Sequence, residues 1–215
     1  MDVVYAIVSN HLHLYGMKKS ETKERLLKAT LKLISEKGYL GATTREIAQE
    51  AGVTELTLFR HFGSKEKLFE ELLKSYTFLP KLKELLPGLD GLSCEQSLTM
   101  IANRFLLTLK ERKAMISILF SEVTTYPEKI RKVYNNFIDE MRATLAGYFK
   151  VLQDRGLLKK NISPEIAARV FLWILFYYFR SEEIMRDGSG MTKQKLEKNV
   201  GEIVRIFMYG TVTID

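Results

Sequence analysis

Cysteine is nearly absent from this sequence, and its scarcity excludes several kinds of site. Cys94 is the single cysteine among 215 residues, so the chain cannot form an internal disulfide. A lone thiol with no histidine near it in the sequence gives no indication of a metal site or a catalytic nucleophile. We therefore expect a protein of the reducing cytoplasm.

Histidines and phosphate-binding motifs are also scarce. His11 and His13 stand close together without a third ligand, and no histidine lies between Glu66 and Asp215. The chain has no glycine-rich phosphate loop, and its carboxylates do not recur at metal-ligand spacing. The sequence predicts no metal, no cofactor and no enzymatic activity.

No apolar run is long enough to cross a membrane. The run Val170–Phe179 has ten residues and is bracketed by Arg169 and Arg180, whereas a membrane helix needs about 20 apolar residues. We expect no contact with a membrane.

The first residues contain a shorter apolar run, Val3–Val8, which resembles part of a signal peptide. Asp2 stands where a signal peptide has basic residues, so we reject that interpretation. We predict that residues 1–16 are a dispensable extension, and that a chain beginning at Met17 folds and functions.

The net charge of +7 permits a nucleic-acid partner without requiring one. Residues 17–79 contain twelve Lys and Arg against nine Asp and Glu, a net charge of only +3. Any inference of DNA binding must therefore rest on the pattern of residues.

Helical periodicity runs through nearly the whole chain, and no alternating strand pattern is present, so we predict an all-helical fold. Gly38 is expected to end the first helix, and Pro80 to separate a domain of residues 17–79 from one of residues 80–215. The predicted helices begin near Ser20–Thr22, Thr43, Thr54, Ser64, Ser93, Arg112, Pro127, Ser163 and Thr192.

The last two predicted helices have the pattern of a dimer interface. Val170–Phe179 is apolar on every side, so it needs burial on more than one face. The final helix, near residues 192–209, has its own apolar stripe. We predict a homodimer in which two such helices from each subunit form a four-helix interface.

The stretch TTREIAQEAGVTELTLFRHF, residues 43–62, fits a helix-turn-helix. Ile47 and Leu58 fall where the unit needs apolar anchors, Ala48 where the helices cross closely, and Gly52 in the turn. The second helix of this unit, which is the third helix of the chain, then directs mainly polar groups outward, as a helix in the major groove of DNA requires.

These residues, with the following Lys65-Glu66 and Leu68, resemble the tetracycline-repressor (TetR) family of bacterial and archaeal regulators. The resemblance covers about fifty residues. It implies a repressor that binds a palindromic DNA operator as a homodimer. It also implies that a small molecule enters the C-terminal domain, shifts the fourth helix and releases the DNA.

The resemblance implies DNA contacts from a defined set of residues. Phosphate contacts are expected from Thr43 or Thr44, His61 and Lys65, and contacts to base edges from the first half of the third helix. The complete predicted set is Thr43, Thr44, Arg45, Thr54, Glu55, Leu56, Thr57, Phe59, Arg60, His61 and Lys65.

Several of these residues have a second interpretation. Leu56 stands where the family often has a small residue; it either touches a thymine methyl or is a tolerated surface residue. Phe59 replaces the usual tyrosine, so a phosphate contact is lost and the ring packs instead. Glu55 either accepts from a cytosine amino group or favours the helix dipole. Arg45 and Arg60 either bind DNA or are solvated.

The residues that contact the effector are less well defined by the sequence. Aromatic residues and methionines at helical spacing belong either to a packed core or to the wall of a cavity, and the pattern alone does not distinguish the two. The scarcity of acidic residues in the stretches that contain the candidates favours a flat hydrophobic or neutral ligand over a strongly cationic one. The candidates are Phe105, Met115, Phe120, Tyr126, Phe137, Phe149, Trp173 and Tyr177.

A second function is compatible with the sequence, namely a helical ligand-binding or partner-binding protein that has the TetR fold without specific DNA readout. Leu56, Phe59 and the modest charge of the N-terminal region favour it. Protection of a palindrome in the gene's own upstream DNA would distinguish the two functions.

Overall fold

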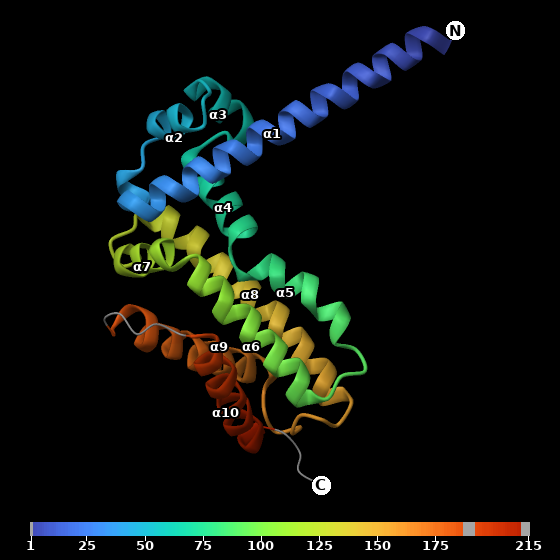
Figure 1. Ribbon diagram of the computed structural model, residues 1–215, viewed down its shortest axis with the longest axis vertical. Coiled ribbons are helices and arrows are strands. Elements are labelled where there is room, and N and C mark those ends of the chain that lie inside the picture. Colours follow the sequence, from blue (N-terminus) through green and yellow to red (C-terminus); the bar gives the residue numbers. More distant parts are fainter. Residues whose placement is uncertain (1, 187–191, 212–215) are drawn as a thin grey trace.

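The computed structural model describes residues 2–186 and 192–211, and these residues contain helices and no strand (Figure 1). The all-helical prediction is confirmed. The N-terminal helices are α1 (Asp2–Gly41), α2 (Thr44–Glu50), α3 (Glu55–Phe62) and α4 (Lys65–Tyr76). The others are α5 (Phe78–Leu85), the 3-10 turn η1 (Leu86–Leu89), α6 (Cys94–Glu111), α7 (Lys113–Glu122), α8 (Glu128–Asp154), α9 (Pro164–Phe179), the π turn η2 (Arg180–Ile184) and α10 (Lys193–Thr211).

Helix α1 begins much earlier than the sequence pattern indicated. It begins at Asp2 rather than near Ser20–Thr22, and its N-terminal part projects away from the other helices (Figure 1). Residues 2–19 contain no proline and a single glycine, Gly16, so no strong helix breaker lies in them. That residues 1–16 are dispensable stays a prediction.

Local capping side chains fix where the short N-terminal helices begin. Thr43 and Glu46 form the predicted capping box of α2, and the Thr54 and Ser64 hydroxyls accept from backbone N–H groups of α3 and α4. A hydrogen bond from the Lys37 ammonium is the main reason that the pKa of the Glu46 carboxyl falls to about 2, and hydrogen bonds from Thr43 contribute as well. Glu46 therefore stays ionised to a lower pH than an ordinary glutamate.

The predicted domain boundary near Pro80 stays a prediction, and Pro80 itself lies inside a helix without ending it. It lies in the first turn of α5, where a backbone N–H has no partner within the helix and its absence costs little. The break falls three residues earlier, at Thr77, where the backbone is extended between α4 and α5.

Two apolar cores lie along the molecule. One contains residues of α1 to α4, and the other begins at Phe78 and contains residues of α5, α6, α8, α9 and α10. The first core also includes Met115 and Leu119 of α7 and Ile130 of α8. The N-terminal head is therefore completed by residues from the C-terminal part of the chain.

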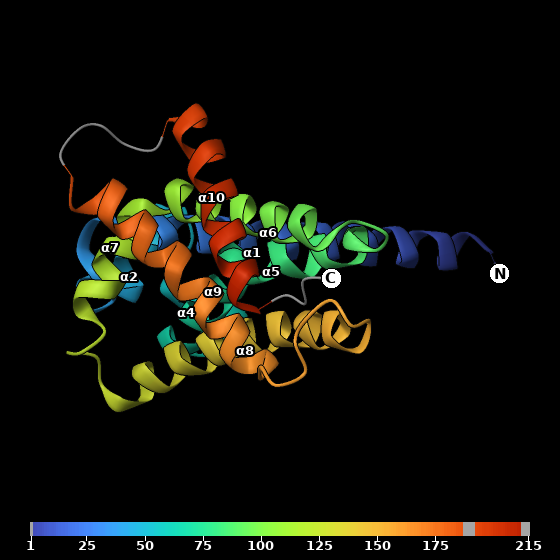
Figure 2. The same ribbon diagram turned by 90° about the horizontal axis from the view of Figure 1, so that it is seen from below.

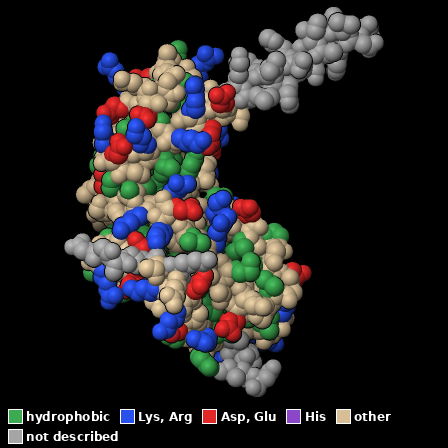
Figure 3. Space-filling view, viewed as in Figure 1, with side chains coloured by type: hydrophobic (Ala, Val, Ile, Leu, Met, Phe, Trp, Pro, Cys, Tyr) green, Lys and Arg blue, Asp and Glu red, His purple; other side chains and the backbone are tan. Residues whose placement is uncertain are grey.

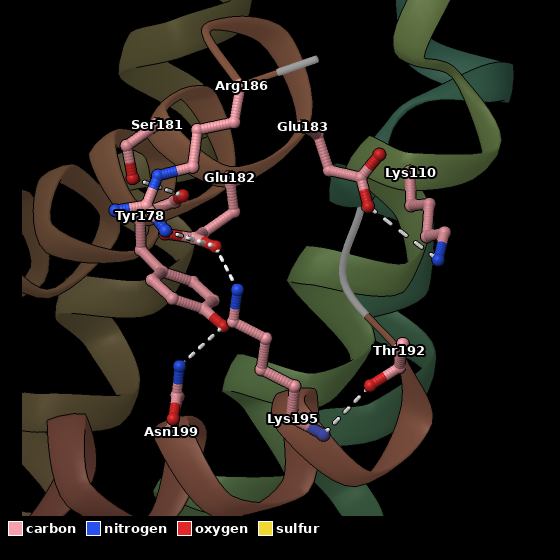
Figure 4. A network of polar contacts seen from close by, with 9 residues as sticks. All are labelled: Lys110, Tyr178, Ser181, Glu182, Glu183, Arg186, Thr192, Lys195 and Asn199. Carbon is pink, nitrogen blue, oxygen red and sulfur yellow. Dashed lines mark hydrogen bonds and ion pairs between the residues drawn. The ribbon is translucent and has the colours of Figure 1, made fainter. Parts of the chain in front are cut away.

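Helices α9 and α10 lie on the outer side of α6 and α8 (Figures 1 and 2). At the end of α9 the π turn buries Glu182 and Glu183, and both carboxylates form ion pairs (Figure 4). Glu182 pairs with Lys195 of α10 and with Arg186, and Glu183 lies 3.6 Å from the Lys110 ammonium of α6. These ion pairs tie the end of α9 to both neighbouring helices.

Candidate nucleic-acid interface and internal cavity

Helices α2 and α3 form one small packed unit with a polar outer face. Ile47 and Leu58 are fully buried, and Ala48 is nearly so. Gly52 has φ +65° in the connecting turn, a conformation that glycine adopts without strain. The predicted anchors of the helix-turn-helix therefore occupy their expected places.

The outer face of α3 has unusual apolar content. Leu56 is 69% exposed and Phe59 is 41% exposed, so neither side chain belongs to the core. Arg45 on α2 and Arg60 on α3 are exposed as well, and His61 is partly buried. Cationic and acidic side chains are mixed over the face of the molecule that Figure 3 shows.

Several predicted contact residues already have partners inside the unit. The Thr44 hydroxyl donates to Glu55 Oε1 at 2.5 Å, which connects α2 to α3. The Thr54 and Thr57 hydroxyls lie 2.9 Å apart, and the Thr43 hydroxyl donates to the capping carboxylate of α2. The Glu55 contact favours a structural role for that carboxylate.

Lys65 lies at the start of α4, with its ammonium 4.4 Å from the centre of the Tyr39 ring. This cation–π contact holds the side chain in place. Burial lowers the pKa of Lys65 from the usual lysine value, while Glu66, Glu122 and Glu46 raise it. The backbone of α1 is not helical at Gly38, and we call this break the Gly38–Tyr39 loop. The Lys65 ammonium is therefore positioned beside this loop.

Glu122, at the end of α7, binds that same loop from the other side. Its Oε2 accepts from the Tyr39 backbone N–H at 2.9 Å and from the Tyr126 hydroxyl at 3.2 Å. Gly38 has φ +75° and ψ 175°, and a Cβ placed there would be 1.8 Å from Glu122 Oε1. The carboxylate occupies the space that the missing side chain leaves.

A cavity of about 90 Å³ lies between α4, α6, α7 and α8. It adjoins a more open depression of about 540 Å³, with which it shares Phe105, Phe120, Tyr134, Ile138, Met141 and Phe176. The lining of the cavity is almost entirely apolar. Its residues are Leu73, Tyr76, Thr77, Phe78, Phe105, Thr108, Leu109, Arg112, Met115, Ile116, Leu119, Phe120, Tyr134, Phe137, Ile138, Met141 and Phe176.

The eight predicted effector contacts separate into three groups. Phe105, Met115, Phe120 and Phe137 line the cavity, and Trp173 lines the open depression. Two others are packed in the cores: Tyr126 against Tyr39, and Phe149 against Phe171 and Phe207. The last, Tyr177, is 68% exposed and lies outside both spaces.

Sequence reasoning missed two residues that the structure makes prominent. Glu122 meets Gly38 and Tyr39 across more than eighty positions of sequence, and no local pattern indicates that contact. Arg112 follows α6 and precedes α7, where the sequence pattern showed a helix start without a role for its guanidinium.

The described residues, 2–186 and 192–211, contain neither a membrane-spanning helix nor a metal-binding cluster. Among them, no helix combines the length and apolarity that a membrane span needs. In the same part of the chain, no group of three or more His, Cys, Asp or Glu side chains is arranged to hold a metal ion.

Comparisons with known proteins agree with this architecture. Residues 26–72 match the model of bacterial regulatory proteins of the tetR family, and residues 96–210 match that of the C-terminal domain of AefR-like transcriptional repressors. The HTH-type transcriptional regulator YvkB of Bacillus subtilis is 33% identical over 158 residues, which cover 74% of this chain and 81% of YvkB.

More distant relatives are also described as transcriptional regulators. The HTH-type transcriptional repressor KstR2 of Rhodococcus jostii is 24% identical over 75% of this chain and 81% of its own. A crystal structure of a TetR-family regulator from Mesorhizobium loti superposes with a TM-score of 0.73 and 25% identity, covering 91% of this chain and 98% of that one.

Proposed function

The chain belongs to the TetR family of helix-turn-helix transcriptional regulators, and from that premise we propose a repressor that binds a palindromic operator as a homodimer. The outward face of α3 combines polar side chains with the exposed Leu56 and Phe59, and the buried Ile47 and Leu58 hold it in place. This face is the observation that carries the proposal. A regulator of this family acts on transcription and is not an enzyme. Its proposed location is the cytoplasm.

An apolar face on α9 and α10 supports the homodimer. Large apolar side chains recur along one stripe of α9, at Ile166, Val170, Trp173, Ile174 and Tyr177, and on α10 at Ile206 and Tyr209. A face of this kind marks an interaction site on a globular protein. A second subunit that covers it would place two α3 helices on successive half-sites, about 34 Å apart or a multiple of that distance.

The position of the cavity supports release by a small molecule. Leu73 and Tyr76, at the end of α4, line it together with Met115 and Leu119 of α7. Helix α4 carries Lys65 at its other end, and α7 ends at Glu122 beside Tyr39. An apolar effector that prefers a different arrangement of α4 and α7 would lower the affinity for DNA, in proportion to its differential affinity for the two arrangements.

Selection of bound DNA from a random pool tests this function. A repressor of the proposed kind enriches a palindrome, and the same palindrome is then protected in the gene's upstream region. If no sequence is enriched while the purified chain is folded and dimeric, the alternative applies, namely a TetR-fold protein that binds a ligand or partner without specific DNA readout.

Lys65→Ala is expected to weaken binding to the operator and to unrelated DNA alike. One lost phosphate contact lowers the slope of log affinity against log salt by about one unit. Binding measured at four or more salt concentrations gives the slope. Lys74→Ala is the matched control, because Lys74 lies at the far end of α4 and pairs with Glu70 at 2.6 Å. Equal slopes for Lys65→Ala and the unchanged protein would exclude the phosphate role.

A further inference from the structure

Arg112 is the one charged side chain among the described residues that line the cavity. It stands between α6 and α7, where its backbone N–H donates to the Thr108 and Leu109 carbonyls at 3.2 Å. Its guanidinium carbon lies 5.3 Å from the centre of the Tyr76 ring. A full positive charge therefore borders a space whose walls are otherwise apolar or hydroxylic.

The guanidinium of Arg112 has an unused donor. Its Nε is buried and has no hydrogen-bond partner among the described residues. Buried polar groups are normally paired, and a charged donor left unpaired destabilises a fold. The Nε therefore leaves a charged donor available to a partner that is not part of the chain.

Three other polar side chains around the cavity already have partners within the chain. The Tyr76 hydroxyl donates to Glu24 at 2.7 Å, the Thr77 hydroxyl donates to the Leu73 carbonyl, and the Thr108 hydroxyl donates to the Arg104 carbonyl at 2.8 Å. In the adjoining depression, Arg142 lies 3.4 Å from Asp139. Arg112 is thus distinguished from the second arginine near these spaces by its buried Nε, which has no partner among the described residues.

We propose that the cavity binds a small molecule with an apolar body and a single anionic head, whose carboxylate pairs with Arg112. The proposal rests on the proposed function, in which this cavity is the effector site, and it specifies the class of effector. Arginine suits the role because it stays charged and presents its donors in a fixed fork that matches a carboxylate. The sequence-based expectation of a hydrophobic or neutral ligand is thereby changed to an anionic amphiphile, and a cationic ligand stays disfavoured.

The location of Arg112 also connects the effector to the head. Arg112 immediately precedes α7, and ten residues later that helix ends at Glu122, which holds the Gly38–Tyr39 loop. A carboxylate that draws the guanidinium toward the cavity acts on the N-terminal end of α7. The opposite end of the same helix contacts the DNA-binding head.

Displacement of a neutral fluorescent probe, N-phenyl-1-naphthylamine, by octanoate and by 1-octanol tests the proposal. The two competitors share an apolar chain and differ in the head group. A charged hydrogen bond contributes about 1.5–3 kcal/mol, so octanoate is expected to bind at least about tenfold more tightly than 1-octanol. In Arg112→Met that preference should disappear, while the affinity for 1-octanol changes by less than about threefold.

Arg142→Met is the matched control and should keep the preference for octanoate, because Arg142 already has an acidic neighbour. Arg112→Lys keeps the charge and should retain part of the preference for octanoate. This variant replaces Arg112→Met in the experiment if Arg112→Met does not fold. Equal affinities of the unchanged protein for octanoate and 1-octanol would overturn the role of Arg112 while leaving the cavity as an effector site. Failure of the probe and of both competitors to bind would overturn the effector site itself.

Discussion

A chain carrying both Tyr177→Glu and Ile206→Glu is expected to be monomeric and to lose about 10²–10⁴-fold in operator affinity, the factor that linkage of two binding modules provides. Tyr177 of α9 and Ile206 of α10 are 68% and 70% exposed in the single chain. In a two-fold interface each substitution occurs twice, so four carboxylates would enter an apolar contact. Burial of unpaired charges is strongly unfavourable.

Light scattering after size exclusion measures the mass, and a gel shift with the selected operator measures the affinity. The matched control carries Leu92→Glu and Met100→Glu, two exposed apolar residues outside α9 and α10. It receives the same added charge and should remain dimeric with unchanged affinity. A dimeric Tyr177→Glu/Ile206→Glu chain with normal operator binding would place the interface elsewhere.

The sequence predicted the features of the head that depend on neighbouring residues. The capping box of Thr43 and Glu46 spans three positions, and the Thr54 and Ser64 caps are equally local. Such interactions join residues that are close in the sequence, so a single sequence is enough to predict them. The same applies to the anchors Ile47 and Leu58, which follow from the spacing of the two helices.

Features that depend on distant residues could not be predicted. Phe149 and Phe120 have the same side chain and the same helical setting, yet Phe149 is fully buried and Phe120 is 40% exposed at the cavity. Tertiary packing decides between these outcomes. Burial of Glu182 and Glu183 likewise depends on Lys195 and Lys110, which approach from α10 and α6. No local pattern contains that information.

Gly38→Ala is expected to lower the free energy of unfolding by about 2–4 kcal/mol. At φ +75° and ψ 175°, any residue other than glycine is strained by about 1–3 kcal/mol. The new Cβ would also displace the Glu122 carboxylate, which lies 1.8 Å from its position, from the Tyr39 N–H and the Tyr126 hydroxyl. A hydrogen bond to a charged group contributes about 1.5–3 kcal/mol, although part of it is regained as the side chain adjusts.

Gly52→Ala separates strain from displacement. Gly52 has φ +65°, but a Cβ there would meet no atom within 4 Å, so only the backbone cost of about 1–2 kcal/mol is expected. Urea unfolding at one protein concentration, followed by the fluorescence of Trp173, gives both values. A Gly38→Ala effect no larger than that of Gly52→Ala would mean that Glu122 moves aside without cost.

A double-mutant cycle with Glu122→Ala then isolates the contact between the head and α7. If displacement of the carboxylate matters, Gly38→Ala costs less in the Glu122→Ala background, by about 0.5–3 kcal/mol. Glu122→Ala alone leaves α3 and its polar face in place, so operator binding without effector should change little. Release of DNA by an effector should require a higher effector concentration, because α7 is then no longer tied to the Gly38–Tyr39 loop. Normal release by Glu122→Ala would assign the coupling to α4 alone.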